Sequence, residues 1–332
     1  MTERLRQLER WLRQACGLSG FSVEPASADA SFRRYFRVST DDGATLVAMD
    51  APPDKEDSRP FILIAERLAA AGLHAPRVHV GDPELGFLLL EDLGNRAYLD
   101  CLDDGSADEL YGDAIAALLR MQRNTGTEDL PSYDRAMLMR EMQLFPDWLL
   151  SRHLGLTLDD SERAMLDGAF ETLIDNALDQ PRVFVHRDYH SRNLMLAEQD
   201  NPGIIDFQDA VFGPVTYDLV SLLRDCYIAW PRRRLDKWVK GYFDAASKAS
   251  LIDGVDEKTF RTWFDLMGVQ RHLKAAGIFA RLYHRDDKPG YLADIPRTLG
   301  YIVDVGKTHA ATTGLADFVE TSVLPDLGSM PK

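Results

Sequence analysis

Residues 185–193 read VHRDYHSRN, and residues 204–207 read IIDF. Between them, the apolar stretches 194–197 and 203–206 flank a turn-forming Asp-Asn-Pro-Gly sequence at 200–203. Apolar runs on both sides of such a turn predict a short antiparallel β-hairpin. This small β-structure interrupts a part of the chain whose apolar periodicity is otherwise helical.

Three oxygen-bearing side chains gather at the open end of the expected hairpin. If the strands pair symmetrically about the turn, Asn193 and Asp206 stand opposite each other, and a short loop brings Asp188 to the same end. Carboxylate and amide oxygens are hard donors that suit Mg²⁺ together with phosphate oxygens. The alternative is that Asp188 caps a turn and Asp206 merely ends a strand. His190 also permits a metal-hydrolase interpretation, although H-x-D-x-H lacks further histidine partners.

The N-terminal part of the chain combines strands with helices. Residues 5–15 carry an amphipathic helical stripe that ends near Gly17. Residues 31–39 and 45–49 flank the turn-forming residues 41–43 and predict a β-hairpin. A helix is further expected at 60–71, and strands at 78–80 and 87–90.

The remainder of the chain is mainly helical in its periodicity. Helices are expected at 110–121, 137–153 and 161–178, a further helical region at 219–282, and a strand at 183–185. The last ~15 residues contain Pro325, Gly328 and Pro331 and are expected to form a loose tail. A strand-rich beginning followed by a longer helical part indicates an α+β protein.

The composition limits the classes of function. The chain has 332 residues, enough for about two domains at roughly 150 residues each. Its 38 Lys and Arg against 53 Asp and Glu give a formal net charge of −15, which disfavours nucleic acid and anionic membrane surfaces as partners. Three scattered cysteines, a charged N-terminus and the lack of a long apolar run predict a cytoplasmic protein without a signal peptide or a spanning helix.

The spacing H-x-D-x-x-x-x-N, followed by I-D-F, is that of the kinase catalytic loop and metal-binding segment. With SFRRYFRV, VAMDAPP, LLLEDLG, EMQLFPDWLL and IIDFQDAVFGPVTYDLVSLLRDCY, it resembles the aminoglycoside phosphotransferase-like kinases. Among these it is most similar to the bacterial kinases of the anomeric hydroxyl of N-acetylmuramate and N-acetylglucosamine, which act in peptidoglycan recycling. The resemblance implies a two-lobed protein-kinase-like fold, with a small β-rich N-lobe at 1–92 and a larger, mainly helical C-lobe at 93–332 that carries the catalytic hairpin.

The resemblance also implies roles for individual residues. Asp188 is the base that accepts the proton of the attacking hydroxyl, and Asn193 and Asp206 hold the Mg²⁺ that bridges the phosphates of ATP. His186 and Asp218 support the catalytic loop through hydrogen bonds and take no part in the reaction.

The nucleotide-binding side departs from the usual kinase pattern, because Met49 stands where a phosphate-binding lysine is expected. The turn at 29–32 offers backbone N–H groups and a serine hydroxyl, and we expect Arg33 or Arg34 to replace the lysine. The alternative is that these arginines only solvate an edge strand. By the resemblance, the segment after residue 90 contacts adenine. The expected nucleotide-binding residues are Ser31, Phe32, Arg33, Arg34, Val47, Leu90, Glu91 and Leu93.

Candidates for binding the acceptor lie in residues 140–148. Carboxylates accept hydrogen bonds from sugar hydroxyls and an indole packs on a pyranose, so Glu141, Asp147 and Trp148 are candidates, and Asp209 is another by its proximity to the metal-binding segment. The alternative is an amphipathic helix that places some of these side chains in the core.

These observations predict an ATP- and Mg²⁺-dependent kinase of an amino sugar that transfers phosphate to the C1 hydroxyl. Its partners are then the small-molecule sugar and ATP, with no nucleic acid, membrane or obligate protein partner. Two alternatives remain open: a kinase of another hydroxyl acceptor, such as an aminoglycoside, choline or an amino alcohol, and a non-catalytic nucleotide-sensing protein.

Overall fold

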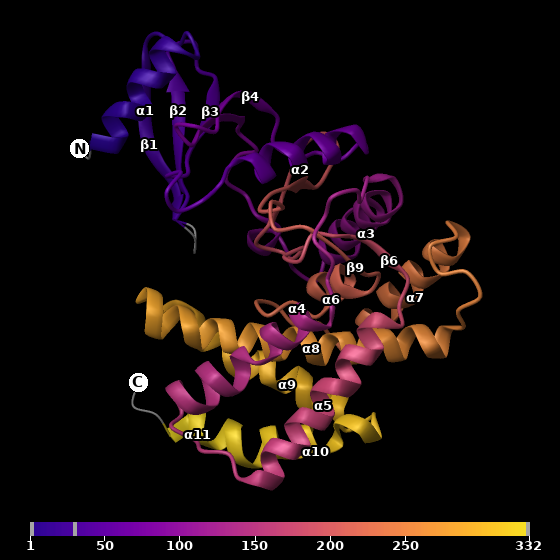
Figure 1. Ribbon diagram of the computed structural model, residues 1–332. Coiled ribbons are helices and arrows are strands. Elements are labelled where there is room, and N and C mark those ends of the chain that lie inside the picture. The colour runs from indigo at the N-terminus through magenta and orange to yellow at the C-terminus, as the bar shows by residue number, and fades with distance from the viewer. Residues whose placement is uncertain (1–2, 29–31, 330–332) are drawn as a thin grey trace. The chain divides into compact units, whose positions relative to one another are not determined.

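The computed structural model (Figure 1) describes residues 3–28 and 32–329. Ser31, which we expect at the nucleotide, lies outside the described residues. An antiparallel sheet of five strands and a set of mainly helical segments are both present, so the predicted α+β class is confirmed. No helix in the described ranges is long and apolar enough to cross a membrane.

The chain packs as two compact units. The first consists of residues 1–126 and 192–209, and the second of residues 127–191 and 210–332. The predicted hairpin therefore belongs, by its contacts, to the unit built mainly from the beginning of the chain. The lobe boundary expected at residue 92 refers to the lobes of a family fold, which these units do not test, and it stays a prediction.

A five-stranded antiparallel sheet, in the order β1-β2-β3-β5-β4, organises the first unit. β2 and β3 form the predicted hairpin, with Phe36 opposite Ala48 and with Gly43 in the turn at φ +86°, a conformation that glycine adopts without strain. β1 is not among the predicted strands, because Pro25 and the register shift after it disturb the alternation. The strands are β1 Phe21–Ala28, β2 Arg34–Thr40, β3 Thr45–Asp50, β4 Val78–Asp82 and β5 Phe87–Glu91.

Helix α1, Glu3–Gln14, covers one face of this sheet, as the indigo part of Figure 1 shows. Its predicted stripe is buried: Leu8, Trp11 and Leu12 pack in one cluster with Phe36 and other sheet residues. Burial of a large apolar side chain contributes about 1.5–3 kcal/mol, so this contact fixes the helix on the sheet.

The short hairpin of β7, Leu194–Met195, and β8, Gly203–Ile204, is anchored to the rest of the first unit by the half-buried amide of Asn201. The Nδ2 group of Asn201, in the turn, donates to the hydroxyl of Tyr98 and to Oδ2 of Asp113, at 2.7 Å in each case. These two bonds hold the turn, and so set the position of the residues at the open end.

Helices α2 and α3 complete the first unit. The ring of Phe61 on α2 lies 4.8 Å from that of Phe207, just beyond the hairpin, and Ile204 N donates to the carbonyl of His74 at 2.8 Å. The hairpin is therefore held on two sides. The helical bounds are Arg59–Ala70 for α2, Tyr98–Asp100 for the 3₁₀ turn η1 and Ala107–Asn124 for α3.

A helix of 30 residues, α8 (Glu257–Asp286), is the centre of the second unit. It packs against α9, α5, α6, α4 and the π-helical segment η2, and Figure 1 shows it in orange with α9 and α5 against it. At Gly277 a Cβ would lie 2.4 Å from the carbonyl carbon of Leu144, so only glycine permits this approach. The other elements are α4 Arg135–Met142, η2 Phe145–His153, α5 Asp160–Leu178, β6 Arg182–Val185, β9 Val211–Pro214, α6 Tyr217–Leu223, α7 Arg232–Lys248, η3 Pro289–Asp294, α9 Ile295–Gly306, η4 Ala310–Thr312, α10 Thr313–Phe318, η5 Val319–Val323 and α11 Leu324–Ser329.

The second unit corrects two sequence predictions and confirms a third. The expected helix 137–153 is α-helical only to Met142 and then becomes π-helical, because Pro146 lacks the N–H that would continue the α-helical pattern. The region 219–282 is helical as expected and consists of α6, α7 and α8. The expected loose tail is helical through Ser329, with Pro325 in the first turn of α11, where a missing N–H costs nothing.

Candidate active site

The loop that follows β6 carries the candidate base, and a buried carboxylate holds its first residues. Asp218, in the first turn of α6, accepts hydrogen bonds from the backbone N–H of His186 at 2.7 Å and of Arg187 at 3.0 Å. Arg187 has φ +79°, a strained conformation that recurs at functional sites. Asp188 N in turn donates to Nδ1 of His186 at 3.3 Å. His186 and Asp218 thus lie where a supporting role requires them.

A second buried carboxylate holds the other end of this loop. Asp225 Oδ2 accepts from the backbone N–H of Ser191 at 2.9 Å and from its hydroxyl at 2.5 Å. Asp225 Oδ1 accepts from Tyr227 N at 2.9 Å. Both ends of the loop are therefore fixed, and Asp188 lies between them.

The charge on Asp188 is stabilised by its surroundings. Burial alone would raise the pKa of this carboxyl, but Lys274, His190, Arg187 and Arg271 hold the pKa well below its ordinary value. Asp188 is consequently ionised at neutral pH, as a proton acceptor must be before the reaction.

Glu141 is buried beside two of the same cations. It forms ion pairs with Arg187 and with Lys274 Nζ at 3.3 Å, and it accepts a hydrogen bond from the hydroxyl of Tyr133. Lys274 Nζ also donates to the hydroxyl of Tyr217 at 2.9 Å. Burial acts to raise the pKa of Glu141, but Lys274 and Arg187 keep it below its ordinary value. Both carboxylate oxygens are thus engaged, and a direct contact of Glu141 with the acceptor stays a prediction.

The two candidate metal ligands lie together in the first unit. Strands β7 and β8 pair Leu194 with Ile204, so Asn193 faces Ile205 across the hairpin, and the expected register was wrong by one residue. Asp206 has left-handed backbone, φ +63°, and its Oδ2 accepts from Asn193 Nδ2 at 3.3 Å. The side chains of Asn193 and Asp206 therefore meet although the two residues are not opposite each other in the strand register.

One carboxylate and one amide oxygen fit Mg²⁺ when phosphate and water oxygens complete its shell, because this ion rarely relies on an all-protein cage. The described residues contain no group of three or more His, Cys, Asp or Glu side chains arranged to hold a metal ion. The donor set therefore suits a cation that arrives with phosphates.

Arg33 lies beside this pair. Its Nη2 is 3.3 Å from Asp206 Oδ1, its Nη1 is 3.7 Å from Glu56 Oε1, and only 8% of the residue is exposed. Gln208 Nε2 also donates to Asp206 Oδ1, at 3.0 Å. A buried guanidinium thus lies beside a candidate metal ligand in a chain that lacks the usual lysine.

The other arginines of this strand bind elsewhere. Arg34 forms an ion pair with Asp50, a fully buried carboxylate that also binds Arg4 Nε at 2.8 Å. Arg37 donates to the two oxygens of Asp92 at 2.7 and 3.0 Å. These contacts favour Arg33 over Arg34 as the replacement for the lysine, whose place is taken by the buried Met49.

The residues expected around adenine lie at the end of β5. Val47 is opposite Leu90 in the sheet, and the Leu93 side chain packs on the hairpin glycine Gly203. The backbone N–H of Glu91 donates to the carbonyl of Arg77 at 2.9 Å. Phe32, in contrast, is 64% exposed. The nucleotide contacts of these residues stay predictions.

The sequence pattern of the phosphotransferase enzyme family matches residues 22–257, which contain Asp188, Asn193 and Asp206. The chain belongs to this family. This phosphotransferase is 48% identical over 312 residues to an N-acetylmuramate/N-acetylglucosamine kinase of Pseudomonas putida, with 91% of each chain covered. It is 49% identical over 310 residues to the enzyme of that name in Pseudomonas aeruginosa, covering 90% of this chain and 91% of the relative. The enzyme of that name in Neisseria meningitidis serogroup B is 41% identical over 314 residues, covering 93% and 92%.

Solved structures share the fold of this phosphotransferase. A choline kinase from Streptococcus pneumoniae superposes with a TM-score of 0.64 at 12% identity, covering 90% of this chain and 99% of that chain. A Plasmodium vivax ethanolamine kinase gives a TM-score of 0.65 at 12% identity, covering 90% and 89%. The predicted protein-kinase-like fold is confirmed. So is the predicted enzyme class, a phosphotransferase with a hydroxyl acceptor, and ATP use follows from the kinase family.

Three further acceptor candidates have contacts of their own in the structure. Asp147, on η2, is exposed and accepts from Gln143 Nε2 at 3.3 Å. Trp148 is half-buried, with the Arg152 guanidinium 5.0 Å from its ring centre. Asp209 belongs to the first unit and accepts from its neighbour Gln208 at 3.2 Å. Their contacts with an acceptor stay predictions.

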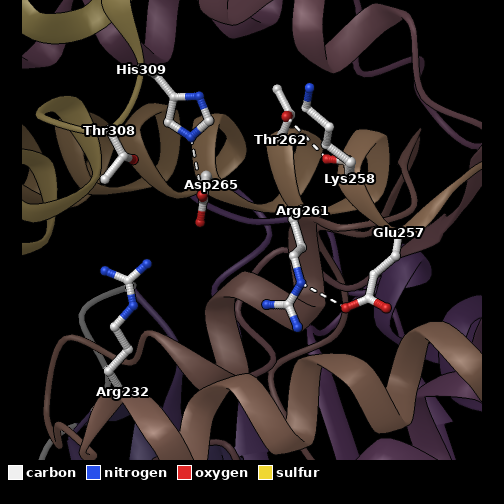
Figure 2. A pocket seen from close by; sticks show the side chains of 8 residues that line it. All are labelled: Arg232, Glu257, Lys258, Arg261, Thr262, Asp265, Thr308 and His309. Atoms are coloured by element: carbon white, nitrogen blue, oxygen red, sulfur yellow. Dashed lines mark hydrogen bonds and ion pairs between the residues drawn. The ribbon is translucent and has the colours of Figure 1, made fainter.

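A separate open hollow of about 510 Å³ lies in the second unit, beside α7 and α8 (Figure 2). Its charged side chains largely pair with one another: Arg261 Nε binds Glu257 at 2.9 Å and His309 Nε2 lies 3.0 Å from Asp265 Oδ2. Its lining residues are Arg232, Glu257, Lys258, Arg261, Thr262, Asp265, Thr308 and His309.

Sequence reasoning missed the cations of α8. Arg271 and Lys274 are 5% and 6% exposed, although they carry full charges. The signal was present: both interrupt residues 266–280, a stretch of the helix that is otherwise almost entirely apolar. Charges inside an apolar helix are costly unless they serve a pair or a ligand, so they mark a site.

Proposed function

We propose that this phosphotransferase transfers the γ-phosphoryl group of ATP to the anomeric hydroxyl of N-acetylmuramate and N-acetylglucosamine, in the recycling of cell-wall sugars. The observation that carries the proposal is the identity of 41–49% with kinases named for these two sugars, over at least 90% of this chain. The cytoplasm is the proposed location, and the three free cysteines suit its reducing conditions.

The chemistry assigned to Asp188 follows from its charge. The ionised carboxylate accepts the proton of the C1 hydroxyl while the sugar oxygen bonds to the γ-phosphorus. The bond from that phosphorus to the β,γ-bridging oxygen breaks, and its electrons leave with ADP. A hemiacetal hydroxyl is more acidic than an ordinary alcohol, so a base of low pKa suffices when the loop holds it in position.

Asn193 and Asp206 are the residues that would hold Mg²⁺, which neutralises phosphate charge when bound. Arg33 would then supply the second positive charge on the phosphates, in the role that a lysine has in most kinases.

The test is a panel of acceptors with ATP and Mg²⁺, with the products followed by mass and by phosphorus NMR. Coupling of phosphorus to the C1 proton identifies the anomeric product, and turnover of only cationic acceptors, or of none, contradicts the proposal. Asp188→Asn should lower kcat by about 10²–10⁴-fold while nucleotide still binds, because shape is kept and the proton acceptor is lost. More than a third of wild-type kcat in that variant would exclude Asp188 as the base.

A further inference from the structure

Arg271 is a buried guanidinium that lacks the partner its neighbours have. The residue is 5% exposed, its Nη1 lies 3.6 Å from Cys226 Sγ, and its Nε has no hydrogen-bond partner in the part of the chain that the structure describes. Other largely buried arginines of this unit are paired: Arg187 with Glu141, and Arg224 with Asp265. Asp188 and Asp225 act on this charge, but the buried Nε of Arg271 has no acceptor, and an unsatisfied buried donor is unfavourable, so this guanidinium is suited to a ligand.

The position of Arg271 connects it to the candidate base. It lies one turn before Lys274 on α8, and so on the same face of the helix. Its contact Cys226 directly follows Asp225, the carboxylate that holds Ser191 at the end of the catalytic loop. The charge of Arg271 also helps to keep Asp188 ionised.

Lys274 is not available for the same task. Its Nζ already binds Glu141 at 3.3 Å and the hydroxyl of Tyr217 at 2.9 Å. Arg271 is therefore the one of these two α8 cations with donors to offer, and a guanidinium presents them in the planar arrangement that matches a carboxylate.

We propose that Arg271 binds the carboxylate of N-acetylmuramate and so favours this acceptor over N-acetylglucosamine. The inference rests on the proposed function. The two sugars differ by a lactyl ether whose carboxylate is ionised at neutral pH, and N-acetylglucosamine carries a hydroxyl in its place. Arg271 thus acts on specificity, while Asp188 acts on both acceptors alike.

The test compares three acceptors: N-acetylmuramate, its carboxamide and N-acetylglucosamine. With the wild-type enzyme, the carboxamide should show a KM at least tenfold above that of the acid. In Arg271→Gln, the KM for N-acetylmuramate should rise at least tenfold, while the KM for the carboxamide and for N-acetylglucosamine stays within twofold. Arg261→Gln, on the same helix but in the hollow of Figure 2, removes the same charge and should leave all three within twofold.

Three outcomes would contradict the inference or the proposed function on which it rests. A loss of kcat of equal size for all three acceptors in Arg271→Gln, with their KM values unchanged, would show that Arg271 acts on the transfer step and not on the sugar carboxylate, and would overturn the inference. Equal wild-type KM values for the acid and the carboxamide would overturn it without any variant, whatever the folding of Arg271→Gln. If the wild-type enzyme phosphorylates none of the three sugars, it is the proposed function that fails.

Discussion

Removal of the Arg33 charge tests whether Arg33 binds the phosphates of ATP in place of the usual lysine. In Arg33→Met the side chain keeps much of its length, but Asp206 loses a cation at 3.3 Å and the phosphates lose their protein-supplied positive charge. A hydrogen bond to a charged group contributes about 1.5–3 kcal/mol, and each 1.36 kcal/mol is a factor of ten. The value of kcat/KM for ATP should therefore fall by about 10- to 150-fold. The 8% exposure of Arg33 favours the upper part of this range, because water screens a buried charge poorly.

The assay varies ATP at saturating sugar and then sugar at saturating ATP. The loss should appear mainly in the ATP parameters. Because Arg33 and Mg²⁺ are both attracted to Asp206, the Mg²⁺ concentration needed for half-maximal activity should not rise in Arg33→Met. Arg34→Met is the matched control: its partner Asp50 keeps Arg4, and its ATP parameters should stay within threefold of wild type. An Arg33→Met protein with wild-type melting and an ATP kcat/KM within twofold of wild type would refute the reasoning.

Three other outcomes follow from single residues. Asp206→Ala should abolish turnover and weaken Mg²⁺-dependent nucleotide binding, as calorimetry with and without Mg²⁺ can measure, because Asn193 alone is a poor ligand set. Burial, aided by neighbouring arginine charge, lowers the pKa of His272 to about 3, so the unfolded state binds a proton that the folded state does not once pH falls below about 6.5. The free energy of unfolding should thus decrease with acidification between these pH values by up to about 1.4 kcal/mol per pH unit. Urea titrations at a series of pH values measure this decrease, which should be smaller in His272→Gln. Gly277→Ala should lower stability to urea by about 1–3 kcal/mol, because its Cβ would meet the Leu144 backbone at 2.4 Å.

Local spacing was enough to find the parts of the site that lie close together in sequence. The catalytic loop and the metal-binding segment are separated by one hairpin, so a turn and two apolar runs indicate that Asn193 and Asp206 are near each other. The left-handed backbone of Asp206 could not be predicted, because aspartate adopts this conformation more readily than most residues but still does so at only a few of its positions.

Contacts between distant segments could not be predicted in this way. Which of Arg33 and Arg34 faces Asp206 depends on the path of the chain ahead of β2, and alternation along a strand gives only the two faces. The ion pairs of Glu141 with Arg187 and Lys274 join three separate elements, and no periodicity links those elements. The sequence therefore predicted the type of chemistry better than the surroundings that tune it.

Because residues 192–209 belong to the first unit, the ribosome cannot finish that unit when residue 126 has been made. The hydroxyl of Tyr98 and the carboxylate of Asp113 cannot bond to the amide of Asn201 until Asn201 has been synthesised. This happens only after the 65 residues from 127 to 191, which belong to the second unit. During that interval the nascent chain carries incompletely bonded polar groups and uncovered apolar surface, the state in which chaperones and proteases act. The order of synthesis thus makes the hairpin with the candidate metal ligands the last part of the first unit to be put in place.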